Sequence, residues 1–330
     1  MADHKRRFDT PFSAFATVLR DKKNRENLIA PSPPTDRLDG LTCLVTGANS
    51  GLGRAIAFNL ARRGARLVLA IRNGDTKTET AIIKETDNKN VTTLPVDLSD
   101  LRSVDALIAA ISQHAPNIDR LILNAGLMAS TARKTPQGYE DMFAVHYLAN
   151  YRLVTGLAEA GLLQKSASGS PPRIIGITSE AHRSAADIEM ADLGEFKPHK
   201  FGTALKQYGH TKLAMMQMLT GLSQRYKDEK GAPTLSIFQS SPGPVNTRIA
   251  RSAPRLIRPF AKLVLPLLFQ SPEQASAPAV YLACSPDMDR KTGLYMHLMQ
   301  FRAPSDRAMD QAHIDAVLTF AQKACNDHLA

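Results

Sequence analysis

The chain has 330 residues, which suggests one or two domains and is long enough to bury a large core. Hydrophobic residues make up 43% of it and charged residues 22%, an ordinary globular mixture that excludes global disorder, a collagen-like fibre and a disulfide scaffold. Lysine and arginine number 41 and aspartate and glutamate 31, so the formal net charge is +10. This basic balance suits a nucleic acid, an anionic membrane surface or a phosphorylated ligand, without choosing among them.

The cysteines and the N-terminal composition indicate the compartment. The chain has three cysteines, Cys43, Cys284 and Cys325. An odd number of cysteines and the absence of a C-x-x-C pair suit a reducing compartment. No apolar run approaches the roughly 18 residues that span a bilayer. The apolar stretch 11–19 is short and ends at Arg20 with no cleavage site after it, which argues against a signal peptide. We therefore expect a cytoplasmic protein, with association with a membrane as the alternative.

The first 40 residues are predicted to form an N-terminal arm. Pro31, Pro33 and Pro34 end any helix near its close. Four apolar residues before them recur at helical spacing, namely Phe8, Phe12, Phe15 and Leu19. This pattern favours a short helix on the protein's own domain or a disordered arm, and the alternative is a peripheral membrane anchor.

From residue 41 onward, short apolar strand patterns alternate with helical patterns for some 200 residues. The expected strands are 42–45, 66–71, 91–96, 121–123, 173–178 and 234–238. The expected helices are 51–63, 76–86, 100–113, 137–163 and 208–227. This alternation predicts right-handed βαβ units in a Rossmann-like α/β fold, a doubly wound parallel sheet within three αβα layers. No linker divides 41–300, so we expect a single domain there, and then a helical tail over 301–330.

The turn after the first strand reads T-G-x-x-x-G-x-G, with glycines at 47, 51 and 53. Gly47 permits a tight turn, Gly51 lets the backbone approach a pyrophosphate, and Gly53 permits close packing of helix on strand. A helix that starts near Gly51 directs free N–H groups and its positive dipole end at the phosphates. Because the motif lies between the first strand and the first helix, it predicts a dinucleotide site.

The end of the second strand indicates which dinucleotide binds. Arg72 stands there in place of the acidic residue that would bind both ribose hydroxyls and repel a 2′-phosphate. Arg54 adds positive charge where that phosphate would lie. Two solvated arginines are the alternative, but their position favours NADP(H).

Tyr208 and Lys212 form a Y-x-x-x-K pattern, which on a helix puts the phenol and the ammonium on one face. A nearby cation favours the phenolate, so Lys212 would lower the Tyr208 pKa toward the range useful for proton transfer. Tyr226 and Lys230 repeat the pattern in a charged run at a helix end, which we interpret as a solvated face. Ser179 follows a strand on the ligand-binding edge, where its hydroxyl would bind a substrate oxygen or else cap a turn.

Together these motifs resemble those of the short-chain dehydrogenase/reductase family over residues 41–300. They run in the family's order: TGANSGLG at 46–53, Asp97-Leu98, Asn124-Ala125-Gly126, Ser179, Tyr208-x-x-x-Lys212 and Pro242-Gly243-x-Val245-x-Thr247. Further segments are similar to the retinol-dehydrogenase-like branch: ARLVLAIRN at 65–73, Pro136-x-Gly138-Tyr139-Glu140 and Ser179-Glu180-Ala181-His182. The resemblance implies hydride transfer between a nicotinamide and a substrate carbon, with no metal.

The resemblance also implies residue roles. Tyr208 would be the general acid or base, Ser179 would polarise the substrate oxygen, and Lys212 would hold the nicotinamide ribose. Asp97 would bind the adenine amine, with Leu98 beside it. The remaining cofactor contacts would come from the glycine-rich turn and two later loops: Asn49, Ser50, Leu52, Asn124, Ala125, Gly126, Pro242, Gly243, Val245 and Thr247.

One position departs from the family's pattern. Residues 143–150 are similar to the helix that carries a catalytic asparagine in the family, but His146 stands at that position and Asn150 lies one turn later. In the family that helix position holds a water in a proton relay to the lysine. His146 would hold the water through a ring nitrogen or through its backbone carbonyl, would interrupt the relay, or would be a packed side chain with no proton role.

Residues 248–270 correspond to the family's mobile flap over the substrate. Within them, 251–268 mixes basic with apolar residues, and Pro254, Pro259 and Pro266 break it into short pieces. The apolar face suggests a lipophilic substrate, and the charges suggest an anionic membrane surface or an acidic substrate. Burial of the apolar face on the flap's own domain is the alternative.

We therefore expect an NADP(H)-dependent oxidoreductase that interconverts a hydrophobic carbonyl compound and its alcohol, such as a retinoid-, steroid- or polyketide-like substrate. The lack of zinc-ligand spacing and of tryptophan argues against a nucleic acid partner. The alternative function is a cofactor-binding pseudoenzyme acting as a membrane-associated sensor or scaffold. The family resemblance suits a homo-oligomer, whereas the basic arm and apolar flap suit a membrane-bound monomer.

Overall fold

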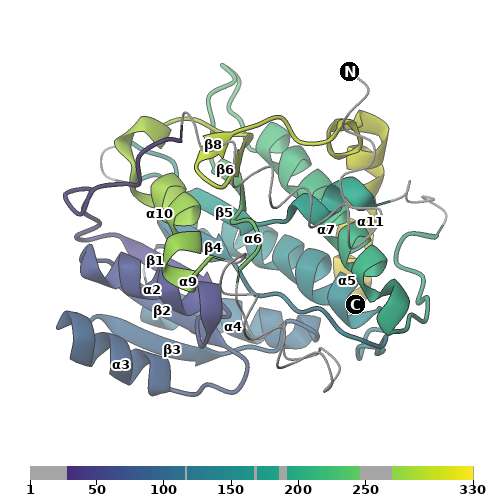
Figure 1. Cartoon of the computed structure of the whole chain (residues 1–330), viewed down its shortest axis with the longest axis horizontal. Coiled ribbons are helices and arrows are strands. Elements are labelled where there is room, and N and C mark those ends of the chain that lie inside the picture. Colours follow the sequence, from purple (N-terminus) through teal and green to yellow (C-terminus); the bar gives the residue numbers. More distant parts are fainter. Residues whose placement is uncertain (1–27, 116, 167–168, 186–191, 246–269, 330) are drawn as a thin grey trace.

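The computed structural model of the chain describes residues 28–115, 117–166, 169–185, 192–245 and 270–329. The apolar pattern of the arm, Thr247 and nearly all of the expected flap lie outside the described residues. The described part forms one sheet with helices on both faces (Figure 1). The predicted Rossmann-like architecture is therefore confirmed.

Within the described residues, the sheet has eight strands in the order β3-β2-β1-β4-β5-β6-β7-β8. The strands from β1 to β7 pair in parallel, and β8 runs antiparallel to β7. Their bounds are β1 Thr42–Thr46, β2 Arg66–Ile71, β3 Val91–Pro95, β4 Arg120–Leu123, β5 Arg173–Ile177, β6 Ser236–Ser241, β7 Leu294–His297 and β8 Gln300–Phe301. Because β1 pairs with both β2 and β4, the strand order reverses beside it, which is where sheets of this kind bind ligands.

Two layers of helices enclose the sheet (Figure 1). One layer holds α2 (Gly51–Arg62), α3 (Lys77–Thr86), α9 (Pro272–Ala275) and α10 (Ala277–Cys284). The other holds α4 (Leu101–His114), α5 (Asp141–Phe143), α6 (Ala149–Glu159), α7 (Phe201–Arg225) and α11 (Gln311–Leu329). Helix α11 packs along α7 and closes the second layer from outside.

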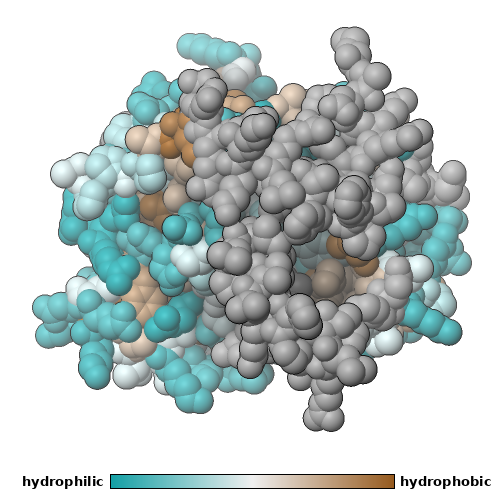
Figure 2. Space-filling model, viewed as in Figure 1, coloured by the Kyte–Doolittle hydropathy of each residue, from teal (hydrophilic) through white to brown (hydrophobic). Residues whose placement is uncertain are grey.

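The outer surface around α2 and α3 is mostly hydrophilic on the face that Figure 2 shows. Helix α3 explains this locally, because Thr78 and Ile82 are its buried residues and its other side chains are polar or partly exposed. Among the described residues, no helix combines the length and the apolar run that crossing a bilayer requires.

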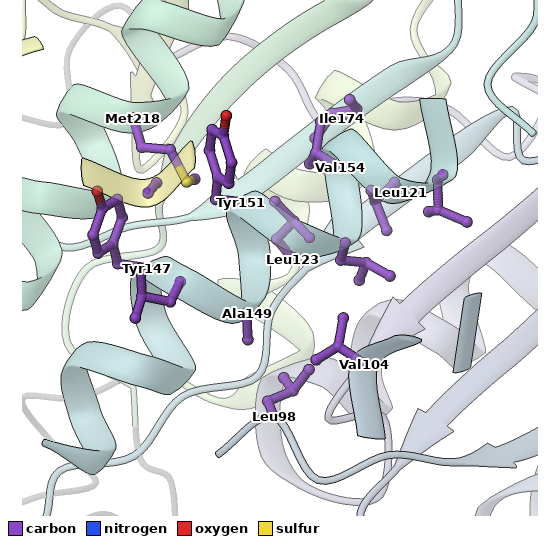
Figure 3. Packing of buried hydrophobic residues seen from close by; sticks show 14 of the residues in the cluster. Leu98, Val104, Leu121, Leu123, Tyr147, Ala149, Tyr151, Val154, Ile174 and Met218 are labelled. Atoms are coloured by element: carbon purple, nitrogen blue, oxygen red, sulfur yellow. The ribbon is translucent and has the colours of Figure 1, made fainter. Parts of the chain in front are cut away.

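The core lies on both faces of the sheet, as alternation along each strand dictates. On β2, Val68 faces the α4–α6–α7 layer while Leu67 and Leu69 face the α2–α10 layer. Figure 3 shows the first of these clusters, where side chains of β4 and β5 meet those of α4, α6 and α7. Strands buried on both faces read as continuous apolar runs, which is why β2 was predicted with its observed bounds.

Three expected elements differ from the structure. The helix expected over 137–163 is divided into α5, a π-helical segment η1 (Ala144–Leu148) and α6. The helix expected from 208 begins at Phe201, where the Thr203 hydroxyl accepts from the Lys200 N–H at 3.2 Å and caps its first turn. The strand expected over 234–238 lies at Ser236–Ser241, because its last polar residues are buried between β5 and β7.

Candidate active site

Four of the predicted motifs meet at one edge of the sheet. Gly47, Asn124, Ser179 and Pro242 come at or shortly after the ends of β1, β4, β5 and β6, which are neighbours in the sheet. Because these strands are parallel, their carboxyl ends lie at the same edge. The fold therefore brings the glycine-rich turn and the expected catalytic loop together.

The glycine-rich turn has the conformation that its glycines predict. Gly47 and Gly51 have φ of 66° and 53°, in the left-handed region that other residues rarely adopt. At Gly53, a side-chain carbon would lie 2.3 Å from Asn124 Nδ2 and 2.4 Å from the Gly47 carbonyl oxygen, so no larger residue fits. Asn124 in turn donates from Nδ2 to the Thr46 carbonyl oxygen at 2.9 Å, which ties the ends of β1 and β4 together.

The N-terminus of α2 suits an anion. Its first turn carries no acidic residue, and the Ser50 side chain at the N-cap makes no capping hydrogen bond in the described structure. The first main-chain N–H groups of α2 are thus available, and the helix dipole favours negative charge beside them. Leu52 is buried in the core under this turn, so its expected cofactor contact would be through its backbone.

The two expected phosphate-binding arginines lie near acidic partners. Arg72 Nε is 4.0 Å from Asp97 Oδ1, and Arg54 Nη2 is 3.7 Å from Glu85 Oε1. Arg54 also lies over the ring of Phe58, 4.4 Å from its centroid. Both guanidinium groups are partly exposed, so either ion pair can give way to a stronger anionic partner at little cost.

Asp97 is held in place by its own turn. Ser99 donates to Asp97 Oδ1 from both its backbone N–H at 3.0 Å and its hydroxyl at 2.7 Å. Burial acts to raise the pKa of Asp97, but these bonds and the charge of Arg72 together lower it, so the carboxylate is ionised at neutral pH. Leu98 points instead into the core (Figure 3), so its side chain does not share this site.

The expected catalytic residues converge on one place. Tyr208 and Lys212 lie one turn apart on α7, with Lys212 Nζ 5.7 Å from the centroid of the Tyr208 ring. Ser179 lies beside the Tyr208 hydroxyl and acts to lower the pKa of that group. Its oxygen also accepts from the Ala181 N–H at 3.2 Å, so Ser179 is both a site residue and the cap of the 3₁₀ turn η2 (Glu180–Ser184).

The pKa values run against the sequence-based expectation. Burial raises the pKa of Tyr208 to about 12, and the effect of Ser179 offsets only part of that rise. Burial also lowers the pKa of Lys212 to about 7, because no carboxylate is paired with its amine among the described residues. Lys212 Nζ donates to the Ile177 carbonyl oxygen at 2.9 Å. The described surroundings of Tyr208 therefore keep the phenol protonated at neutral pH.

His146 lies inside the same cluster, fully buried on the π-helical segment η1. Its ring stands edge-to-face against Tyr208, with centroids 5.4 Å apart. The Leu127 N–H donates to Nε2 at 3.0 Å, so Nε2 carries no proton and Nδ1 does. Nδ1 lies 2.8 Å from the Thr211 hydroxyl, which itself donates to the Tyr208 carbonyl oxygen at 2.9 Å.

Both ring nitrogens of His146 are thus engaged, and burial together with the charge of Lys212 holds its pKa well below the usual value. Asn150 donates from Nδ2 to the His146 carbonyl oxygen at 2.8 Å. The ring and the carbonyl each have a partner within the protein. This arrangement fits a histidine that fixes the position of its neighbours better than one that binds a relay water.

Several functional contacts were not predicted from the sequence. Thr211 links His146 to the Tyr208 backbone, and Leu127 orients the histidine ring through its N–H. The sequence signal for Thr211 is a polar residue beside Lys212 on a face of α7 that turns inward. The Leu127 contact is made by backbone, so its side chain gives no signal.

The remaining expected cofactor residues lie in the surrounding loops. Gly126 is exposed, and a side-chain carbon there would lie 3.2 Å from His146 Nε2. Gln270 donates to the Pro242 carbonyl oxygen from Nε2 and to the Pro244 carbonyl oxygen from its N–H, both at 3.0 Å. The second Y-x-x-x-K copy is not part of this site, because α7 ends at Arg225 and Tyr226 packs against the core.

Known proteins of similar sequence show which family has this site. A family model described as short chain dehydrogenase matches residues 41–189. Retinol dehydrogenase 13 of Mus musculus is 31% identical over 314 residues, which cover 92% of this chain and 90% of that protein. Retinol dehydrogenase 14 of Mus musculus is 32% identical over 290 residues, with 83% of each protein covered.

Solved structures agree with the fold. A protein of Mycobacterium Paratuberculosis matches with a TM-score of 0.69 at 23% identity, covering 90% of this chain and 98% of that one. Pseudomonas aeruginosa RhlG, solved as an NADP active-site complex, matches with a TM-score of 0.59 at 22% identity, covering 81% and 98%. The chain thus belongs to the short-chain dehydrogenase/reductase family, and within that family it is retinol-dehydrogenase-like.

Proposed function

We propose that the chain is an NADP(H)-dependent oxidoreductase that interconverts a hydrophobic carbonyl compound and its alcohol. The observation that carries this proposal is the convergence of Ser179, Tyr208 and Lys212 at the sheet edge beside the glycine-rich turn. A proton-transfer group and a dinucleotide cradle at one edge are what hydride transfer to or from a carbon–oxygen bond requires.

The residues present fit the cofactor. The tight turn at Gly47 and the uncapped N-terminus of α2 suit a pyrophosphate. Asp97 offers a carboxylate for an adenine amine, and Arg54 and Arg72 offer positive charge for a 2′-phosphate. When bound, the nicotinamide supplies or accepts the hydride. Solved relatives in complex with NADP or NADPH, such as RhlG, support this choice.

The protein's own groups would handle the proton. Tyr208 is protonated at neutral pH, so it donates a proton to the carbonyl oxygen as that oxygen gains charge during reduction. The Ser179 hydroxyl donates a hydrogen bond to the same oxygen. Lys212 has a pKa near 7, and when it is protonated its charge stabilises the resulting phenolate and can bind a ribose hydroxyl.

The relatives support a hydrophobic substrate. Retinol dehydrogenases 13 and 14 and human polyprenol dehydrogenase are named for long isoprenoid alcohols, and the last is 29% identical over 271 residues. The basic and apolar sequence at 251–268 suits such a compound, and contact with an anionic membrane surface would suit its delivery.

The first test is a thermal-shift titration with NADPH, NADP⁺, NADH and NAD⁺. A ligand at 100 times its dissociation constant stabilises the native state by about 2.7 kcal/mol, which is readily measured. A shift with the phosphorylated pair alone is expected. No shift with any of the four would contradict the proposal and favour a scaffold without a nucleotide site.

A second test separates the enzyme from a cofactor-binding scaffold. Tyr208→Phe keeps the ring and removes the proton donor, so NADPH binding persists while carbonyl reduction is lost by at least about a hundredfold. A cellular function that survives this substitution would support the sensor or scaffold instead.

A further inference from the structure

A buried polar cluster lies beside the catalytic residues and takes no part in the proposed chemistry. Glu180 follows Ser179 directly and is 4% exposed. Its Oε2 accepts from Arg183 Nε at 3.0 Å, and its Oε1 accepts from the Tyr295 hydroxyl of β7. A buried carboxylate needs such partners, since an unpaired charge in the interior is strongly unfavourable.

The cluster continues to the next catalytic loop. Ser241 lies beside Tyr295 on the neighbouring strand β6, acts to lower the pKa of the Tyr295 hydroxyl, and directly precedes Pro242. Ser241 Oγ lies 3.1 Å from His297 Nδ1, and the register pairs Ser241 with His297 across β6 and β7. Ser241, Tyr295 and His297 are each exposed by 2% or less. An unbroken, water-excluded chain of contacts thus runs from the turn after β5 to the loop after β6.

The electrostatics favour an ionised Glu180. Burial acts to raise the pKa of its carboxyl, but the charges of His297 and Arg183 and the bond from Tyr295 outweigh it and lower the pKa. A charge-assisted bond from Tyr295 to a carboxylate is stronger and more directional than one between neutral groups. This makes Glu180 a rigid anchor.

The same turn is tied on its other side. His182 is fully buried, and the Ser305 N–H donates to its Nε2 at 3.3 Å, so its Nδ1 donates to the Ser179 carbonyl oxygen at 2.7 Å. Arg183 also donates from Nη2 to the Ala303 carbonyl oxygen at 2.9 Å. The turn that bears Ser179 is therefore fixed to the segment that follows β8.

We propose that Glu180 is a positioning residue, which through Tyr295 and Ser241 fixes the loop beginning at Pro242 against the turn beginning at Ser179. This inference rests on the proposed function, in which Ser179 binds the substrate oxygen, and on the cofactor contact that the family resemblance implies for Pro242 and Gly243. The spacing of the two loops then sets the distance between the carbon that exchanges hydride and its donor. A misplacement of about 1 Å can cost a hundredfold in rate, so a rigid tie has a catalytic consequence.

The test removes one hydroxyl from the chain of contacts. Tyr295→Phe keeps the ring and removes the hydroxyl that binds Glu180 and lies beside Ser241. The matched control is Tyr281→Phe, which removes the hydroxyl of α10 that donates to Asp287 in the turn after that helix. We expect Tyr295→Phe to lower kcat for carbonyl reduction about tenfold, with less than about a twofold change in substrate KM. The control retains kcat.

Hydrogen exchange measured on the same variants supplies a readout independent of activity. In Tyr295→Phe, amide exchange should accelerate in two peptides, 179–185 and 240–245, and in the control it should stay unchanged in both. Acceleration in only one peptide, or in neither, would overturn the tie between the loops. If the wild-type chain reduces no carbonyl compound with NADPH, the proposed function fails, while the exchange result still decides the tie.

Conservative replacement gives the last check. Glu180→Gln keeps an acceptor for the Tyr295 hydroxyl, and Glu180→Ala does not. The Glu180→Gln variant should therefore retain at least about a third of the wild-type kcat, and the Glu180→Ala variant about a tenth or less. Equal kcat in the two variants, in preparations shown to be folded by circular dichroism, would overturn the role of the carboxylate as anchor.

Discussion

At the scale of single residues, the contacts of His146 suit a ring that holds its neighbours in place without transferring a proton. Its Nε2 accepts a hydrogen bond from the Leu127 N–H, and its Nδ1–H donates one to the Thr211 hydroxyl. That hydroxyl in turn donates to the Tyr208 carbonyl oxygen. Protonating Nε2 would break the Leu127 contact in a fully buried place. We therefore propose that the histidine helps to fix the tyrosine in position and does not shuttle protons.

Replacing this histidine tests that assignment. His146→Asn has too short a side chain to keep both contacts, so Tyr208 loses part of its support and we expect kcat to fall about tenfold. NADPH binding, measured by titration, should change little. His313→Asn on α11 is the control, since that histidine is partly exposed and pairs with Asp310. A several-fold rise in kcat for His146→Asn would instead indicate a native relay impaired by the histidine.

The raised pKa of Tyr208 predicts how the rates of reduction and oxidation change with pH. A group with a pKa near 12 is protonated at neutral pH, so it is ready to act as the acid in reduction. Alcohol oxidation needs the phenolate, whose fraction grows about tenfold per pH unit below the pKa. Above pH 8, where Lys212 with its pKa near 7 is already neutral, we expect oxidation to accelerate with pH while reduction does not. Steady-state rates in both directions between pH 8 and 10 decide this, and a pH-independent oxidation rate would contradict it.

At the scale of elements, continuous apolar strands were predictable and mixed segments were not. β2 matches its predicted bounds because it is apolar on both faces. β6 was placed two to three residues too early, because burial of Gln239, Ser240 and Ser241 depends on neighbouring strands that no local pattern reveals. The π-helical segment escaped prediction for a related reason, since a one-residue change in helical winding leaves the apolar spacing nearly intact.

The candidate site was predictable where its chemistry depends on residue type and spacing. Gly47, Ser179, Tyr208 and Lys212 were found because their motifs follow strand ends or lie at i and i+4 on one helix. The expected direction of the Tyr208 pKa shift was wrong, because spacing places Lys212 near the phenol but does not show that Lys212 is buried and that Tyr208 is partly withdrawn from solvent. The positioning role of Glu180 was not predictable, because its partner Tyr295 lies more than a hundred residues away on β7.

The loop after β2 contains Arg72, from which we predict a preference for NADPH over NADH. Arg72 is 60% exposed and its nearest acidic partner is Asp97 at 4.0 Å, so a 2′-phosphate can recruit it readily. Arg72→Ala should weaken NADPH binding by about 1.5–3 kcal/mol, the worth of a charge-assisted hydrogen bond, and leave NADH binding nearly unchanged. Arg66→Ala, at the opposite end of the same strand, is the control. Equal losses for NADPH and NADH, measured by titration, would count against a phosphate contact.

At the scale of the whole molecule, the C-terminal helix completes the layer that supports the site. α11 packs along α7, the helix that bears Tyr208 and Lys212 (Figure 1). Its Val317 carbonyl oxygen accepts from the Tyr147 hydroxyl, next to His146 on η1. The expected helical tail is thus part of the packing around the catalytic helices. Burial of its apolar face contributes stability in proportion to the area covered.

The contribution of α11 can be measured at Leu318, which is 6% exposed and lies against Gly221 of α7. Leu318→Ala leaves a cavity between the two helices and should lower the free energy of unfolding by about 2–4 kcal/mol. Leu329→Ala, at the exposed end of the same helix, removes the same atoms without a cavity and should change it by less than about 0.5 kcal/mol. Urea unfolding followed by circular dichroism gives both values. Equal values would mean that the Leu318 contact does not hold α11 against α7.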